Sequence, residues 1–111
     1  MDDLKYQNII ESVLQEYIEY IGDSEPEVQK EQVFDREGKH FLLVETGWQN
    51  NRRIYGAIIH IDIINGKVWI QQDGTEEGVA YDLVKAGIPK EHIVLGFKAF
   101  PRRETTEFAV S

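Results

Sequence analysis

The stretch HIDIINGKVWIQQDGTEEG, His60–Gly78, decides the expected fold because it places a hairpin turn between two strand-like runs. Asn65-Gly66 occupies the turn, and both residue types tolerate the positive φ that a two-residue type I′ turn requires. This turn sets a register in which Asp62 faces Trp69. The stretch therefore predicts a tight antiparallel hairpin with a defined pairing of side chains.

Alternation sorts the side chains of this hairpin into two faces. The apolar face carries Ile59, Ile61, Ile63, Val68 and Ile70. Burying each of these side chains contributes roughly 1.5–3 kcal/mol, so this face is the predicted core. The other face carries His60, which faces Gln71, together with Asp62, Trp69 and, diagonally, Asp73.

Outward from the hairpin, β-branched and aromatic residues form runs separated by the turn-rich segments DREGK, GWQNNRR and ING. The runs predict four antiparallel strands in a meander, near residues 28–35, 39–48, 53–64 and 67–73. Gly56 is a candidate β-bulge inside the third strand.

Helical periodicity flanks the meander on both sides. Apolar residues three and four apart predict an amphipathic helix over Asp3–Ile21, stopped by Gly22. A second helix is expected from about Glu76 to Ala86, and the run HIVLGF after it predicts a short strand or extended segment, followed by a short helix or docked tail. The fold class is α+β, with residues 1–111 forming a single domain.

Composition limits the function classes. The chain has 111 residues, of which 41% are hydrophobic and 29% charged, as in ordinary globular proteins. No apolar run approaches a membrane span, and the start MDDLKYQN does not resemble a signal peptide, so a cytoplasmic location is expected. The absence of cysteine excludes thiolate metal sites and cysteine nucleophiles. A net charge of -8 argues against non-specific DNA binding.

The polar face raises the question of a metal site. His60, Asp62 and Asp73 could converge there, but they lack any recognised metal-ligand spacing. A wet sheet face with a hydrogen bond from histidine to aspartate is the favoured interpretation, and no metal or other cofactor is expected. Asp73 has a structural explanation of its own, as the first residue of a capping box with Glu76, with Thr75 as the competing N-cap.

No catalytic residues are predicted. The serines lie in a helix, a loop and the terminus, without a nucleophile-elbow motif. Five glycines are isolated turn or bulge residues, so no phosphate-binding loop is expected: Gly22, Gly38, Gly47, Gly56 and Gly66. We therefore expect a protein that is not an enzyme.

Two surfaces are candidates for binding, because tryptophan and arginine dominate interface hot spots. The candidate partner surface comprises Trp48, Arg52, Arg53, His60, Asp62, Trp69 and Gln71. The candidate nucleic-acid patch comprises Arg52, Arg53, Arg102 and Arg103. Exposed strand edges also make a homo-oligomer a candidate assembly.

The ordered run GAIIHIDIINGKVWIQQDGTEEGVAYDLVKAGIPKEHIVLGF, preceded by VETGWQNNRRIYG and followed by TTEFAVS, resembles the XisI-like family, the fdxN element excision controlling factors. The resemblance covers essentially the whole chain. The family is associated with cyanobacterial DNA rearrangement, in which a separate recombinase performs the DNA recombination and accessory factors are also needed. The resemblance implies no catalytic residues.

Three functional hypotheses follow. The leading one is a non-catalytic controlling factor that binds an XisH-like protein or the recombination machinery, which the resemblance implies as partners. The second is a DNA-contacting accessory protein that uses the arginine patch. The third is a small metal-dependent enzyme built on His60, Asp62 and Asp73.

Overall fold

The computed structural model describes residues 3–21 and 26–111. In chain order its elements are α1 (Asp3–Ile21), β1 (Val28–Asp35), β2 (His40–Gln49), β3 (Arg52–Ile64), β4 (Lys67–Asp73), α2 (Val79–Lys85), the 3-10 helix η1 (Lys90–His92), β5 (Ile93–Leu95) and α3 (Phe100–Arg103). The predicted α+β class, first helix and four-stranded meander are confirmed. The predicted helix stop at Gly22 lies outside the described residues.

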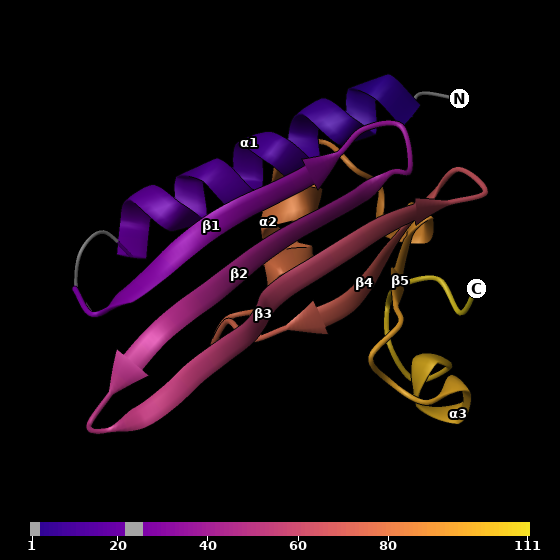
Figure 1. The fold of residues 1–111 in the computed structure, drawn as a ribbon. Helices are drawn as coiled ribbons and strands as arrows, with labels where there is room; N and C mark the ends of the chain where they lie inside the picture. Colours follow the sequence, from indigo (N-terminus) through magenta and orange to yellow (C-terminus); the bar gives the residue numbers. More distant parts are fainter. Residues whose placement is uncertain (1–2, 22–25) are drawn as a thin grey trace.

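The five strands form one sheet in the order β1-β2-β3-β4-β5 (Figure 1). The first four are antiparallel, and β5 runs parallel to β4, with Leu95 opposite Ile70. The parallel pairing is possible because α2 carries the chain back along the sheet between these two strands. The expected C-terminal strand is therefore present, and the chain continues through the short helix α3 to a tail in which Ala109 bridges Val94.

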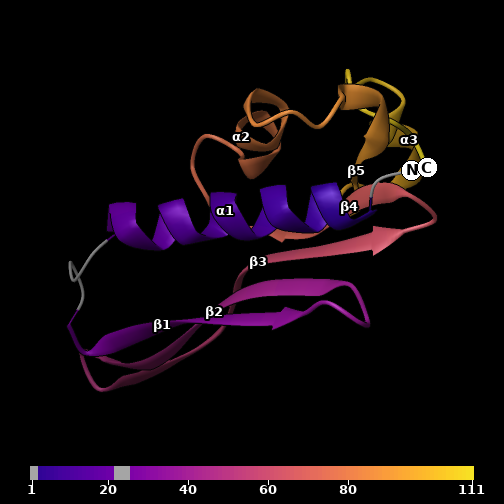
Figure 2. The ribbon, with the colours of Figure 1, turned by 90° about the horizontal axis from the view of Figure 1, so that it is seen from above.

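Both longer helices lie on one side of the sheet (Figure 2). Ile10 and Leu14 of α1 and Leu83 of α2 are fully buried against the sheet. The sheet contributes Phe41 and Leu43, together with the predicted core side chains Ile59, Ile61, Ile63, Val68 and Ile70. Alternation along the strands therefore produces the core that the hairpin sequence predicts.

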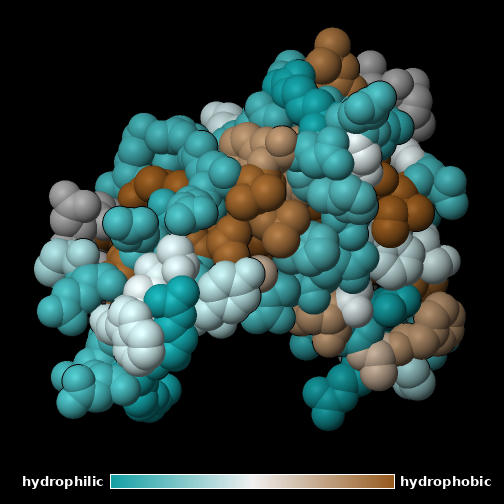
Figure 3. All heavy atoms as spheres, viewed as in Figure 1, coloured by the Kyte–Doolittle hydropathy of each residue, from teal (hydrophilic) through white to brown (hydrophobic). Residues whose placement is uncertain are grey.

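The opposite face of the sheet, which we call the open face, is covered by neither α1 nor α2 (Figures 1 and 2). Figure 3 looks onto this face and shows apolar side chains near its middle, surrounded by hydrophilic ones. The register places Val33, Leu42 and His60 in one row across it. Val33 is exposed, and Leu42 and His60 are half-buried, so this face keeps substantial contact with solvent.

Candidate functional site

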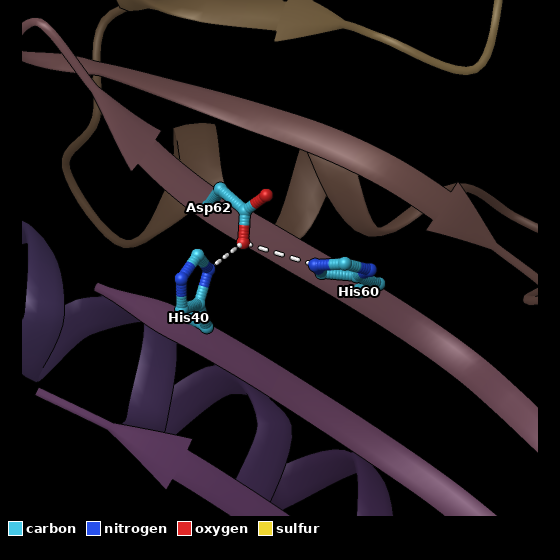
Figure 4. Close-up of side chains that lie close together, drawn as sticks. All are labelled: His40, His60 and Asp62. Carbon is cyan, nitrogen blue, oxygen red and sulfur yellow. Dashed lines mark hydrogen bonds and ion pairs between the residues drawn. The ribbon is translucent and has the colours of Figure 1, made fainter. Parts of the chain in front are cut away.

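A cluster of three side chains, His40, His60 and Asp62, lies on the open face. His40 begins β2 and stands directly opposite Asp62 of β3, and His60 precedes Asp62 by two residues on the same strand. The Nδ1 of His40 is 2.7 Å and the Nε2 of His60 is 2.9 Å from the same oxygen, Oδ1 of Asp62. Figure 4 shows both rings directed at this carboxylate. We call this group the His–Asp cluster.

A β-bulge brings His40 into the cluster. The Asn50-Asn51 turn, with φ of 53° and 66°, starts a register that would pair His40 with the core residue Ile61. The register shifts between Leu43 and Val44, leaving Ile58 as the extra residue of β3. Because a shift of one residue exchanges the two faces of a strand, His40 instead meets Asp62. The bulge predicted at Gly56 therefore lies two residues further along the chain.

A second irregularity adjusts the predicted hairpin register. The Asn65-Gly66 turn and the pairing of Asp62 with Trp69 are as predicted, but His60 pairs with Gln72 rather than with Gln71. Gln71 is the extra residue of β4 and its side chain reaches the cluster diagonally. Its Nε2 donates to Oδ2 of Asp62 at 3.3 Å, so both carboxylate oxygens of Asp62 accept hydrogen bonds.

The electrostatics of the cluster favour an ionised aspartate. Asp62 is only 8% exposed, and burial by itself raises its pKa, but hydrogen bonds from His40 and His60 outweigh this and lower the pKa below its usual value. The hydrogen bond to Asp62 is also the main reason why the pKa of His40 is raised. The buried carboxylate is therefore a fixed negative charge with two imidazoles beside it.

The third predicted member of a metal-binding set, Asp73, lies elsewhere. Its Oδ1 accepts hydrogen bonds from the amide and the hydroxyl of Thr75, and its Oδ2 accepts one from the amide of Val79 at 2.8 Å. The hypothesis of a site built on His60, Asp62 and Asp73 is therefore wrong in its third ligand. The capping box with Glu76 is also wrong, because α2 begins at Val79 with Gly78 as its N-cap, and the carboxylate of Asp73 accepts from the amide of Val79 across the loop.

Trp69 continues the row of the His–Asp cluster onto β4 and is half-buried. The guanidinium of Arg103 lies 5.2 Å from the centre of its ring and 5.9 Å from that of Phe100. Arg103 also donates to the backbone oxygens of Lys98 and Val110, at 3.0 and 3.2 Å. The C-terminal segment thus covers part of Trp69, and Arg103 acts as a structural clamp there.

Three of the predicted binding residues lie beside the β2–β3 turn: Trp48, Arg52 and Arg53. Trp48 is 54% exposed and has the guanidinium of Arg53 at 5.5 Å from its ring. Alternation from the turn directs Arg52 to the face opposite Arg53. This turn and the α3 segment, which holds Arg102 and Arg103, lie at different ends of the molecule (Figures 1 and 2). The four arginines therefore do not form one continuous patch.

A cleft of about 550 Å³ lies away from the His–Asp cluster, between α1 and the loop that enters α2. Its lining includes Glu16, Tyr17, Tyr20, Glu76, Glu77 and Asp82. Burial, with smaller contributions from Asp73 and Glu76, raises the pKa of Tyr17. The cleft thus has an acidic wall, and no histidine is among its lining residues.

Of the described helices, none combines the length and the apolar character needed to cross a membrane. The fold and the site thus describe a small α+β domain with helices on one face of a five-stranded sheet and polar, aromatic residues on the other. A family model, XisI protein, matches residues 1–110. The chain belongs to the XisI family, as its sequence motifs predict.

Two solved structures have the same fold over nearly the whole chain. The crystal structure of a XisI-like protein from Anabaena variabilis ATCC 29413 is 37% identical, with a TM-score of 0.89, and the match covers 98% of this chain and 99% of that one. The fdxN element excision controlling factor XisI from the same organism is 28% identical, with a TM-score of 0.87, over 100% of both chains. No curated protein matches the chain.

Proposed function

We propose that this protein is a non-catalytic controlling factor for excision of a DNA element, acting in the cytoplasm through protein–protein contacts. The partner would be an XisH-like protein or the recombination machinery. Membership in the XisI family and the name of the excision controlling factor it resembles support a role in excision. The observation that supports an interaction mechanism is the open face of the sheet, which neither α1 nor α2 covers.

The open face has the composition of a protein interface. Trp48, Arg53 and Tyr55 lie at one end, and Tyr55 is 76% exposed. The half-buried Leu42 and Val44 occupy the middle, and the polar His–Asp cluster lies at the other end. An apolar centre with aromatic and arginine anchors is typical of surfaces that bind proteins.

Direct DNA contact has less support. The two arginine pairs lie apart, and Arg53 and Arg103 are each stacked on a tryptophan. The chain also carries 20 acidic against 12 basic residues. A DNA-binding version of the proposal predicts affinity that falls steeply with salt and with replacement of Arg52 and Arg102 by alanine.

The test is affinity purification of the tagged protein from its native host, followed by mass spectrometry of the associated proteins. Trp48→Ala and Tyr55→Ser should each reduce recovery of the partner at least tenfold, because each removes an anchor from the open face. Tyr20→Ser is the matched control, since Tyr20 is 86% exposed on α1, on the other side of the molecule. Binding of the partner at micromolar concentration is then measured with purified proteins.

The outcomes separate the alternatives. No binding to an XisH-like protein or to the recombinase at micromolar concentration would refute the proposal. Recovery of untagged copies of the protein together with the tagged one, and of no other protein, would instead identify a homo-oligomer. Salt-sensitive retention of DNA by the purified protein alone would support the DNA-binding alternative.

A further inference from the structure

We propose that the His–Asp cluster binds a divalent transition-metal ion of the Zn²⁺ class, with His40, His60 and Asp62 as its protein ligands. The three side chains converge from two adjacent strands, and their ligand atoms all lie within 4.8 Å of one another. The sequence predicted no metal here because His40 reaches the site only through the bulge in β3. This proposal does not depend on the proposed function in excision.

The geometry is close to that of a bound ion. Zinc bonds to nitrogen and oxygen are about 2.0–2.2 Å, so neighbouring ligands of a tetrahedral ion lie about 3.4 Å apart. The Nδ1 of His40 and Nε2 of His60 lie 2.7 and 2.9 Å from Oδ1 of Asp62. Small outward rotations of the two imidazole rings make room for the ion, which replaces the protons of the two hydrogen bonds.

The donor set selects the class of metal. Two imidazole nitrogens and one carboxylate oxygen suit Zn²⁺, Co²⁺, Ni²⁺ and Cu²⁺, whereas Mg²⁺ and Ca²⁺ prefer oxygen ligands alone. The Asp62 carboxylate supplies the negative charge, and burial restricts its motion. No other histidine takes part, because His92 is hydrogen-bonded to Tyr6 at 2.6 Å.

The residues around the His–Asp cluster also suit a metal site with three protein ligands. Gln71 donates to Oδ2 of Asp62 and so orients the carboxylate from behind, as outer hydrogen-bond partners of metal ligands commonly do. The side chain of His40 is 53% exposed and that of Asp62 only 12%. The ion would therefore rest on a rigid sheet with its remaining coordination position turned toward solvent.

The test is isothermal titration calorimetry of untagged protein, freed of metal with a chelator, with Zn²⁺ as the probe and Mg²⁺ as comparison. One equivalent of Zn²⁺ should bind and Mg²⁺ should not. His40→Gln, His60→Gln and Asp62→Asn should each weaken Zn²⁺ binding at least tenfold. Gln71→Ala should weaken it about tenfold, the lower end of effects for groups behind the ligands. His92→Gln, which removes the one other histidine, should leave the affinity unchanged.

Circular dichroism of every variant verifies the fold. A second measurement on the unmodified protein follows the imidazole proton resonances: Zn²⁺ should shift those of two histidines and leave the third unmoved. Zn²⁺ binding that is absent from the wild type, unchanged in His40→Gln and His60→Gln, or lost in His92→Gln would each overturn the proposal. The same would hold if Zn²⁺ shifted the His92 resonances alone.

Discussion

The two faces of the sheet are formed by the same strands, yet they depend on different features of the chain. On the helix-covered face, side chains such as Phe41 and Ile61 are fully buried among other apolar groups. On the open face, the neighbouring Leu42 is half-buried and Asp62 is held by hydrogen bonds from polar partners. One face is thus stabilised by apolar burial and the other by specific pairing. A shift of one residue would alter both faces at once, because it would turn the apolar side chains toward solvent and separate the polar partners.

The largest expected effect comes from adjacent residues of β2. Phe41→Ala should lower the free energy of unfolding by about 3–5 kcal/mol, because it leaves a cavity in the core. Leu42→Ala, on the open face, should cost less than about 2 kcal/mol, since Leu42 already contacts solvent. Urea denaturation of both variants measures the difference. Equal losses would show that the open face is as tightly packed as the core.

The next effect concerns Asp62. Asp62→Ala leaves two imidazoles and Gln71 without their acceptor and should destabilise the protein by about 1–3 kcal/mol. Asp62→Asn keeps one acceptor oxygen and should cost less. Denaturation in the presence of a chelator measures the contribution of these hydrogen bonds without any effect of bound metal. If Asp62→Ala left the free energy of unfolding unchanged, the hydrogen bonds of the open face would contribute nothing to stability.

The loop that leaves β4 offers a smaller, local effect. Asp73→Ala removes the acceptor of the Val79 amide and should cost about 1 kcal/mol. The amides of Thr75 and Val79 donate hydrogen bonds to the Asp73 carboxylate, so hydrogen exchange should accelerate at these two amides in the variant. Exchange at core positions of β3 should not change. Glu76→Ala is the control, because α2 begins after Glu76. If Glu76→Ala lowered the free energy of unfolding more than Asp73→Ala does, the prediction of a capping box formed by Asp73 and Glu76 would be supported after all.

The smallest effect is the pH dependence of the open face. The raised pKa of His40 means that its pairing with Asp62 stabilises the fold below the usual histidine value of 6.5, and this stabilisation is lost as pH rises through the raised pKa. The lowered pKa of Asp62 means that its contribution is present above its usual value of 3.8 and is lost as pH falls through the lowered pKa.

Unfolding of wild type and His40→Gln should therefore differ more at about pH 5.5 than at about pH 8.5, with a chelator present. His92→Gln serves as the control, since His92 lies outside the cluster. A difference between wild type and His40→Gln that grows as pH rises would contradict the pairing of His40 with an ionised Asp62.

The fold was largely predictable because it depends on local patterns. Helical spacing predicted α1 with its bounds, and strand-like runs predicted β1 to β4 to within one residue. The start of α2 was not predictable in the same way, since Asp73 bonds across a loop to Val79 rather than to a residue three positions on.

The candidate site was predictable in part. The position of Asp62 opposite Trp69 follows from a two-residue turn only three residues away, where register errors have no room to accumulate. A β-bulge separates the Asn50-Asn51 turn from the contact of His40 with Asp62. The local residue types do not indicate the position at which a strand contains an extra residue. His40 was therefore missed, although counting back from the Asn50-Asn51 turn with one added residue would have found it.

By itself, the sequence determined the fold class, the strands and their turns, the composition of the core and the family, because each of these depends on periodicity or on motifs read along the chain. Only the tertiary structure decided which polar side chains meet on the open face. It joined His40 to Asp62 and His60, gave the Asp73 carboxylate the amide of Val79 as its partner in place of a capping box with Glu76, and separated the arginine pairs. The physical reason is that bulges and twist depend on packing across the whole sheet, which acts between residues far apart in the chain.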